Sequence, residues 1–149
     1  PPDTKIPAGG ELTLPEAIES MGATADGIIT TFHYTMERDD PINNEFVKAF
    51  RDANDGRSPD IFSVGGYDGM HLIYEALKKT DGDADGAKLV DAAKGMAWDS
   101  PRGPISIDPE TRDIVQTVWI RQVEDVDGKP QNVIIDSLPD MKDPLHGAN

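Results

Sequence analysis

The chain has 149 residues, of which 37% are hydrophobic and 28% charged, and its net charge at pH 7 is −14. This length is enough for one domain with a hydrophobic core. The acidic charge argues against binding to nucleic acid or to anionic membrane surfaces, both of which attract Lys and Arg. The charge is spread along the chain, which is typical of a solvated acidic surface that aids solubility.

Cysteine is absent, which excludes disulfides, thiolate nucleophiles and cysteine metal sites but does not decide the compartment. No apolar run approaches the roughly 20 residues of a membrane span, and no signal-peptide pattern stands at the N-terminus. The first residues, PPDTKIPAGG, include no start methionine. We interpret the sequence as a mature chain, a recombinant piece or a fragment that begins in a linker.

The first 53 residues predict alternating helices and strands. Thr13 and Glu16 have the spacing of a capping box around Pro15, and Asp40 before Pro41 is typical of a helix start. The predicted elements are a helix over Pro15–Met21, a strand rich in β-branched and aromatic residues over Gly27–Thr35, and a helix from Ile42 to about Ala53 that buries Phe46, Val47 and Phe50.

The segment Ser58–Lys79 is the stretch around which the chain is organised. The apolar run Ile61–Val64 predicts a short strand or extended loop, Gly65-Gly66 predicts a flexible turn, and Tyr67–Lys79 predicts an amphipathic helix. In α/β proteins, ligands often lie where such a turn meets a helix N-terminus. An ordinary packing unit, in which the glycines only relieve crowding, is the alternative interpretation.

The second half predicts one more helix and then strands. The predicted elements are a helix over Ala87–Lys94 with Leu89, Val90 and Ala93 inward, a loop containing Trp98, a strand over Ile105–Ile107, a turn over Asp108–Thr111, a hairpin of Ile114–Glu124 and Gln131–Ile135 joined by Asp127-Gly128, and a loose tail over Ser137–Asn149. The change from an α/β pattern to a hairpin pattern near Gly95–Pro104 predicts a hinge or crossover between two bodies.

Catalytic and metal-binding patterns are weak in this sequence. His33, His71 and His146 lack metal-ligand spacing, although His33 is a candidate polar contact in a pocket or else a plain strand residue. Paired acids resemble cap and turn chemistry. The run Asp81–Gly86 is similar to the start of a calcium loop, but Ala92 stands where the twelfth-position Glu is required. We therefore expect no enzyme activity, no cofactor and no metal.

Aromatic side chains are the candidates for lining a small-molecule pocket, because such pockets are mostly apolar. They are Phe32, Tyr34, Phe62, Tyr67 and Trp98. Each of them could instead be a core residue. Phe62 is the strongest candidate, since the prediction places it at the end of a strand next to Gly65-Gly66.

Five short motifs occur in a fixed order between about Lys5 and Pro139. They are Ala25-Asp26-Gly27-Ile28-Ile29-Thr30, Asn44-x-Phe46, Gly66-Tyr67-Asp68, Ser100-Pro101-x-Gly103-Pro104 with Asp108 and Thr111, and Gln116. In this order they resemble the C-terminal part of branched-chain amino acid-type periplasmic binding proteins, the ligand-binding receptors of ABC importers. The resemblance implies the type I periplasmic-binding-protein fold, in which two α/β lobes joined by three crossovers close on a ligand.

The resemblance also implies a division of the chain. Residues 1–27 would be a linker and short helix of the second lobe, 28–98 a first-lobe α/β segment, 99–138 the hinge and second-lobe hairpin, and 139–149 a C-terminal tail. Strands near Gly27 and Ile114 would lose sheet neighbours in such a fragment. We therefore expect it to fold only with the missing N-terminal half, present as a second chain or in a dimer partner.

Site residues follow from the same resemblance. Phe62 matches an aromatic position that covers the ligand, and Gly10 or Glu11 falls near an acidic position that pairs with a ligand ammonium. Tyr34 and Tyr67 are further candidates. Family members bind branched-chain amino acids, amides, urea and aromatic acids, and the residues that hold a ligand carboxylate would lie in the missing half, so the ligand stays open.

The implied function is that of a periplasmic or extracellular solute-binding component of an ABC importer. It would bind a small amino-acid-like, amide or aromatic-acid ligand between two lobes and be read by a membrane permease. The alternative is the ligand-sensing domain of a signalling receptor, because the same fold serves both. An enzyme such as a hydrolase is a third interpretation, and it would need a nucleophile–base pair that the sequence does not offer.

Overall fold

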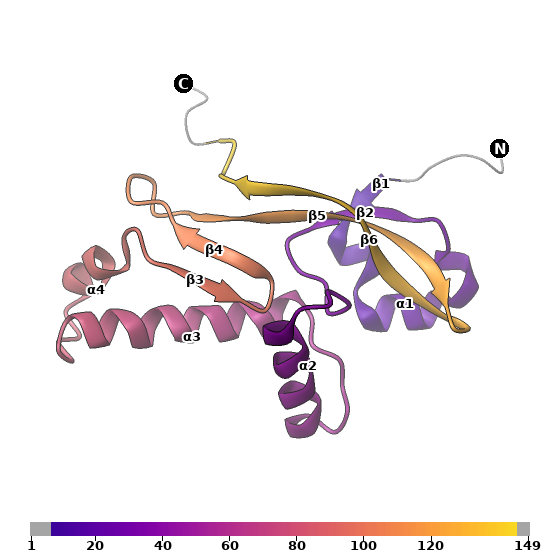
Figure 1. The fold of residues 1–149 in the computed structure, drawn as a ribbon, viewed down its shortest axis with the longest axis horizontal. Helices are drawn as coiled ribbons and strands as arrows, with labels where there is room; N and C mark the ends of the chain where they lie inside the picture. Colours follow the sequence, from indigo (N-terminus) through magenta and orange to yellow (C-terminus); the bar gives the residue numbers. More distant parts are fainter. Residues whose placement is uncertain (1–6, 146–149) are drawn as a thin grey trace.

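A mixed sheet runs along the computed structural model, which describes residues 7–145 (Figure 1). Its strands are β1 (Pro7–Gly9), β2 (Ile29–Phe32), β3 (Ala97–Ser100), β4 (Gly103–Ile107), β5 (Ile114–Val126) and β6 (Lys129–Met141). They lie in the order β1-β2-β5-β4-β3, with β6 also paired to β5. Among the described residues, β1 and β2 pair in parallel and the other strand pairs are antiparallel.

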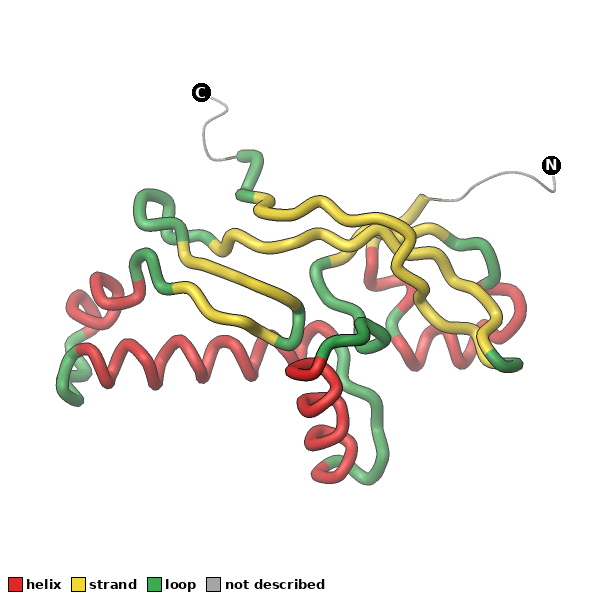
Figure 2. The backbone as a smooth tube through the Cα atoms, in the orientation of Figure 1, coloured by secondary structure: helices red, strands yellow, loops and turns green. Residues whose placement is uncertain are grey.

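Apart from α2, the helices gather at two ends of the long hairpin formed by β5 and β6. They are α1 (Pro15–Met21), α2 (Pro41–Ala53), α3 (Ile61–Lys79) and α4 (Gly86–Ala93), with short 3-10 turns at Gly10–Thr13 and Gly22–Ala25. Figure 2 shows α1 at one end of the molecule, α3 and α4 at the other end, and α2 projecting between them. Strand β5 joins the two ends, because it pairs with β4 near Ile114 and with β2 near Gln122.

The hydrophobic core is divided into three clusters of buried side chains rather than one. Each cluster belongs to a different part of the chain. The buried members are Ile18, Ala25 and Val123 beneath α1; Phe32, Tyr34, Ile61 and Val64 where β2 meets the start of α3; and Ala76, Met96 and Ile107 between α3, α4 and β4. The middle cluster therefore connects the end of β2 with the N-terminus of α3.

Local capping signals predicted several boundaries correctly. Asp40 caps α2, since its Oδ1 accepts hydrogen bonds from the amides of Ile42 (3.0 Å) and Asn43 (3.3 Å), and Pro41 occupies the first turn, where no amide donor is needed. The hairpin turn at Asp127-Gly128 is also confirmed, with positive φ at both residues (54° and 79°), as a tight two-residue turn requires. The predicted bounds of α1 match those observed.

The predicted strand and turn before Tyr67 are wrong, because α3 already begins at Ile61. Asp60 and Ser63 form a capping box in which Asp60 Oδ1 accepts from the Ser63 amide at 2.9 Å and the Asp60 amide donates to Ser63 Oγ at 3.3 Å. This exchange satisfies two amides and starts the helix six residues earlier than predicted. Gly65-Gly66 are interior helical residues, and Phe62 lies in the first helical turn.

Two further expectations about α1 and α4 are wrong. Thr13 does not cap α1: its hydroxyl donates to the Gly10 carbonyl at 3.4 Å and lies 3.1 Å from Thr30 Oγ1. Val90 was expected to point inward but is 44% exposed, whereas Leu89 and Ala93 pack against the third core cluster as expected. Both errors concern side chains whose direction depends on distant parts of the chain.

Long-range strand pairing overturns two predicted irregular segments. Trp98 is not in a loop but in β3, opposite Ile105 of β4. The predicted tail begins too early, because β6 continues through Ser137 to Met141 while paired with β5. The C-terminal residues that include His146 lie outside the described part.

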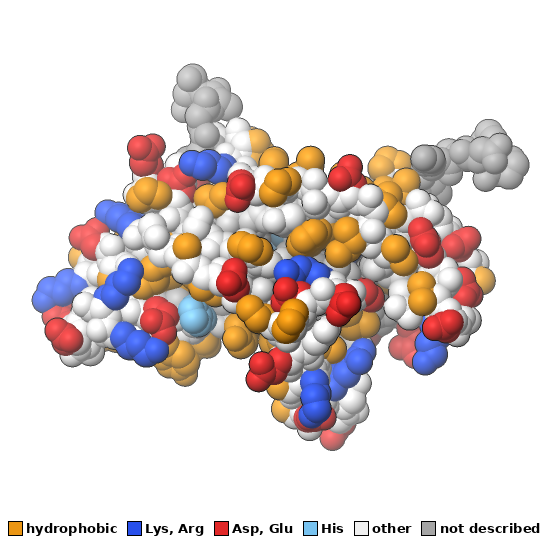
Figure 3. Space-filling view, viewed as in Figure 1, with side chains coloured by type: hydrophobic (Ala, Val, Ile, Leu, Met, Phe, Trp, Pro, Cys, Tyr) orange, Lys and Arg blue, Asp and Glu red, His pale blue; other side chains and the backbone are white. Residues whose placement is uncertain are grey.

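Charged side chains of both signs are spread over the visible face of the molecule, with hydrophobic side chains between them (Figure 3). No basic patch stands out on that face, in keeping with the net charge of −14. Among residues 7–145, no helix is long and apolar enough to cross a lipid bilayer. The division into lobes at residues 27, 98 and 138 stays a prediction.

Candidate functional site

The end of β1 places Gly10 and Glu11 beside the end of β2. Gly10 is buried under the Phe32 ring, and a Cβ on Gly10 would lie 2.1 Å from Phe32 Cγ, so only glycine fits there. Glu11 is exposed, and its carboxylate lies back over Gly9, 3.0 Å from the position that a Cβ on Gly9 would take. The close contact of Gly10 with Phe32 thus fixes the position of the backbone from which the Glu11 side chain extends.

The end of β2 alternates in direction. Phe32 and Tyr34 are buried, at 8% and 2% exposure, and Tyr34 Oη donates a hydrogen bond to Asn43 Oδ1 at 3.2 Å. Burial is the main reason that the pKa of Tyr34 is raised, with Glu37 and Asp60 adding to it. The structure therefore places the candidate Tyr34 in the core, where its hydroxyl is already bonded.

His33 points the other way and is half-buried, with its ring centroid 4.9 Å from that of Phe32. Burial lowers the pKa of His33, the positive charges of Arg102 and Arg121 lower it further, and Glu11 opposes them. At neutral pH the imidazole is uncharged, so it can donate one hydrogen bond and accept another. The structure thus brings His33 into the electrostatic environment of Glu11.

The first turns of α3 present aromatic rings to solvent. Phe62 is 70% exposed and Tyr67 46% exposed, while the Tyr67 ring packs edge-on against Phe46 at 5.3 Å between centroids. Further along the same helix, Met70, Ile73 and Tyr74 are also exposed. Phe62 is therefore available to a ligand or to another part of a larger protein, as the sequence prediction requires.

Arg121 of β5 connects the Gly10 loop with the end of β2. Its guanidinium donates to the Gly10 carbonyl (3.2 Å) and to the Tyr34 carbonyl (2.9 Å), and its Cζ lies 5.1 Å from the centre of the Phe32 ring. Arg121 was not among the predicted site residues. The available signal was an arginine flanked by apolar and uncharged polar residues within the strand IVQTVWIRQVE.

A second buried arginine has an acidic partner. Arg102 Nε lies 2.7 Å from Asp68 Oδ2, and both side chains are 7% exposed. Asp68 also accepts from Trp98 Nε1 at 3.1 Å and from Ser100 Oγ at 2.9 Å. The ion pair connects α3 with the turn between β3 and β4, and the bonds from Trp98 and Ser100 connect α3 with β3. The indole N–H of the candidate Trp98, which is half-buried, is therefore already bonded.

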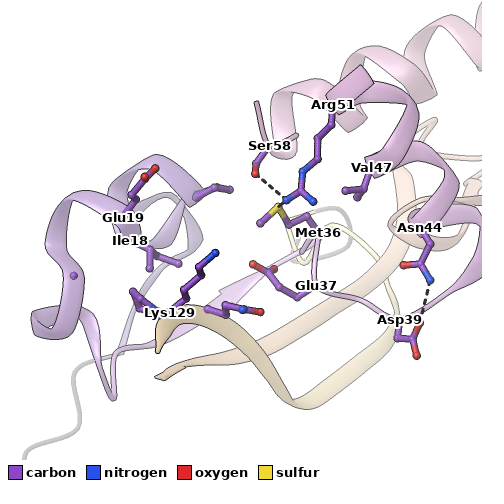
Figure 4. A pocket seen from close by; sticks show the side chains of 14 residues that line it. Ile18, Glu19, Met36, Glu37, Asp39, Asn44, Val47, Arg51, Ser58 and Lys129 are labelled. Atoms are coloured by element: carbon purple, nitrogen blue, oxygen red, sulfur yellow. Dashed lines mark hydrogen bonds between the residues drawn. The ribbon is translucent and has the colours of Figure 1, made fainter. Parts of the chain in front are cut away.

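A cavity lies elsewhere, between α1, the start of β6 and α2 (Figure 4). It has a volume of about 780 Å³ and contains none of the predicted site residues. Its lining residues are Pro15, Ile18, Glu19, Gly22, Met36, Glu37, Asp39, Asn44, Val47, Arg51, Ser58, Lys129, Pro130 and Gln131. In Figure 4 the Glu37 and Lys129 side chains point into this space, and burial raises the pKa of Glu37, although a hydrogen bond from Thr35 opposes the shift.

The predicted ligand residues and this cavity therefore do not coincide. We give more weight to the cluster of Gly10, Glu11 and His33 at the strand ends, because ligands in α/β sheets bind beyond the carboxyl ends of parallel strands, and β1 and β2 are the parallel pair. Within residues 7–145, no three His, Asp or Glu side chains come together as a metal site.

Comparison with known proteins shows that the sequence and the fold of this chain are shared with a class of binding proteins. The sequence profile of the periplasmic binding protein family matches residues 3–129. The chain belongs to this family, and the predicted type I periplasmic-binding-protein fold is confirmed.

Several relatives make the comparison more specific. The Leu/Ile/Val-binding protein homolog 6 of Brucella abortus is 45% identical over 139 residues, which cover 92% of this chain and 36% of the relative. A solute-binding protein of an ABC transporter from Rhodopseudomonas palustris BisB5, solved with 3,4-dihydroxybenzoic acid, is 48% identical with a TM-score of 0.90 over 95% of this chain and 39% of that one.

A third relative is the Rhodopseudomonas palustris HaA2 solute-binding protein, solved with p-hydroxybenzoic acid. It is 36% identical, with a TM-score of 0.90 over 98% of this chain and 40% of that one. The chain thus spans well under half the length of each of these relatives. These three relatives are named as binding proteins, which points away from an enzyme.

Proposed function

We propose that this chain forms part of a periplasmic solute-binding receptor of an ABC importer and that its ligand is a hydroxylated aromatic acid. The carrying observation is the 48% identity and TM-score of 0.90 to the Rhodopseudomonas palustris BisB5 protein, which was solved with 3,4-dihydroxybenzoic acid. The HaA2 relative, solved with p-hydroxybenzoic acid, supports the same ligand class. The partner would be a membrane permease that recognises the ligand-closed receptor.

The strand ends offer groups suited to such a ligand. Glu11 supplies a hydrogen-bond acceptor for a ring hydroxyl, and the neutral His33 supplies a donor and an acceptor. Phe62 offers an exposed aromatic face, and aromatic pairs are favourable in offset or edge-to-face geometry. The buried cation Arg121, which has no carboxylate among its hydrogen-bond acceptors, gives the site a positive charge that suits an anion.

Closure of the receptor would depend on contacts that the ligand makes in the closed state and not in the open state. Phe62 belongs to α3, whereas Glu11 lies in the 3-10 turn after β1 and His33 directly follows β2. A ligand that touches all three holds these elements together, and it shifts the equilibrium toward the closed state only by contacts made in that state. This arrangement needs no bond to be made or broken, which is why a binding role fits better than a hydrolase.

A branched-chain amino acid is the rival ligand, because the Brucella abortus relative carries a Leu/Ile/Val-binding name. Glu11 distinguishes the two classes. With an amino acid, the Glu11 carboxylate would pair with the ligand ammonium, whereas a hydroxybenzoate has no cation and would use Glu11 only as a hydroxyl acceptor. A signalling receptor is less favoured, since the solved relatives named above belong to ABC transporters.

The test is calorimetric titration of a hybrid receptor, in which this chain replaces the matching part of the Rhodopseudomonas palustris BisB5 protein. We expect binding of 3,4-dihydroxybenzoate and 4-hydroxybenzoate, weaker binding of benzoate, and no binding of leucine. Phe62→Ala should lower the affinity for 4-hydroxybenzoate by about tenfold or more, and a tenfold change corresponds to about 1.4 kcal/mol. Leucine binding that is lost in Glu11→Gln, with no aromatic acid bound, would overturn the proposal in favour of the amino acid.

A further inference from the structure

Arg121 is a buried cation whose hydrogen-bond partners among the described residues are all neutral. The residue is 3% exposed. Its Nε donates to Thr30 Oγ1 (3.2 Å), its Nη1 to the Tyr34 carbonyl (2.9 Å), and its Nη2 to Thr30 Oγ1 (3.0 Å), Thr13 Oγ1 (3.1 Å) and the Gly10 carbonyl (3.2 Å). All three guanidinium nitrogens thus donate hydrogen bonds, and none of these acceptors is a carboxylate.

Such an arrangement is hard to explain by stability alone. Burying a charge without an ion-pair partner is costly, and apolar side chains of similar volume often serve stability as well or better. Burial lowers the pKa of Arg121 to about 10, while the more distant charges of Glu37 and Glu11 oppose the shift. The side chain therefore remains charged at neutral pH. Arg102 shows the contrasting case, because Asp68 neutralises it at 2.7 Å.

The partners of Arg121 belong to different segments of the chain. Gly10 and Thr13 flank Glu11 in the turn after β1, Thr30 lies in β2, and the Tyr34 carbonyl lies at the start of the segment that leads from β2 to α2. Arg121 itself lies on β5, opposite Thr30, in the strand that joins both ends of the molecule. One side chain therefore connects the Glu11 turn, the connecting segment and the long strand.

We propose that Arg121 is a positioning residue that couples the Glu11 turn to the connection between the two ends of the molecule. By holding the Gly10 carbonyl and the Tyr34 carbonyl on one planar group, it fixes the distance between the Glu11 turn and the segment that leads from β2 to α2. Arg121 does not touch the ligand; it acts through Glu11. This inference rests on the proposed function, because it assigns Glu11 a contact with the ligand.

The experiment compares Arg121→Lys and Arg121→Met in the hybrid receptor, with Thr13→Val as a milder variant that removes one acceptor and keeps the charge. Hydrogen–deuterium exchange is measured without ligand. We expect faster exchange of the amides in residues 10–13 and 34–36 in both Arg121 variants, and in residues 10–13 of Thr13→Val. Unchanged exchange in residues 10–13 in all variants overturns the proposal, whether or not the receptor binds an aromatic acid.

Ligand titration supplies the second readout. We expect Arg121→Met to lower the affinity for 3,4-dihydroxybenzoate by about tenfold or more. In Arg121→Lys part of this affinity should be retained. The effects of Arg121→Met and Glu11→Gln should be less than additive, because one acts through the other. Ile107→Ala, in the distant third core cluster, is the control for lost stability, and an equal loss of affinity in this control overturns the proposal. Wild-type failure to bind would instead refute the proposed function.

Discussion

The buried ion pair between Asp68 and Arg102 gives a prediction about a single charge. Substituting Asp68→Asn keeps the shape but leaves the Arg102 guanidinium without a counter-ion at 7% exposure. Removing one partner of a buried pair typically costs about 3–5 kcal/mol. We expect a loss of this size in the free energy of unfolding of the hybrid receptor, measured by urea titration.

The control is Asp52→Asn, which removes the partner of Lys48 in an ion pair whose side chains are 66% and 77% exposed. An exposed pair of this kind contributes little, so no measurable change is expected. A loss in Asp52→Asn as large as that in Asp68→Asn would show that burial does not decide the strength of these pairs.

Asp108 gives a prediction about pH. Its carboxylate accepts from Lys142 Nζ at 2.7 Å and from the amides of Glu110 and Thr111, and mainly the Lys142 contact lowers its pKa to about 2. Because the folded carboxyl binds its proton more weakly than the unfolded one, its stabilisation is complete above about pH 4 and is lost as the pH falls toward about 2.

Asp108→Asn should therefore be less stable than the wild type at about pH 6, and the difference should shrink as the pH falls below about 4. Urea unfolding of both proteins at a series of pH values measures it. A difference that stays constant down to about pH 3 would mean that the charge of Asp108 contributes nothing and that only the turn geometry matters.

At the level of elements, we expect the first turn of α3 to contribute both to the stability of the fold and to ligand binding. The capping Asp60 holds the first turn, in which Phe62 is exposed. Asp60→Ala should cost about 1 kcal/mol of stability. It should also lower the affinity for 4-hydroxybenzoate, because the Phe62 ring loses its fixed position. Calorimetry and urea unfolding of the hybrid receptor measure the two effects.

Asp85→Ala is the matched control, since Asp85 caps α4 through the amides of Ala87 and Lys88 and α4 carries no candidate site residue. It should lose similar stability without losing affinity. If both variants lose affinity equally, the cap of α3 has no special relation to the ligand.

The sequence predicts elements well where the signal is local. Asp40-Pro41 and Asp127-Gly128 set a helix start and a turn through their own backbone chemistry, and both predictions hold. The run Ile61–Val64 followed by Gly65-Gly66 favoured a strand and a turn, although the Asp60 and Ser63 pair that starts the helix was already in the sequence. The prediction followed the apolar and glycine residues of this run, whereas the helix start depends on the capping box formed by Asp60 and Ser63.

Long-range partners explain the remaining differences. Trp98 becomes a strand residue only because β4 lies beside it, and Ser137–Met141 only because β5 is long enough to pair with them. In the same way, Glu11 and Phe62 could be selected by a family resemblance, whereas Arg121 could not. Its importance depends on four oxygens that are distant in sequence and meet only in the folded chain.

For the whole molecule, the exposed surface is larger than a compact chain of this mass requires. The accessible area is 9306 Å², whereas the scaling of compact monomers predicts about 7,500 Å² for 16.2 kDa. Part of the excess is the apolar face of α3 that includes Phe62, Tyr67, Met70, Ile73 and Tyr74. Contiguous apolar surface of this kind typically belongs to an interface.

The last prediction is that this chain depends on the rest of a receptor for cooperative folding. With three separate core clusters and an uncovered helix face, the chain alone should unfold over a broad temperature range and bind a hydrophobic dye. The hybrid receptor should instead show a sharp transition and little dye binding. A sharp, cooperative transition of the 149-residue chain by itself would contradict this dependence, and it would mean that the β5–β6 hairpin and its helices form a self-sufficient unit.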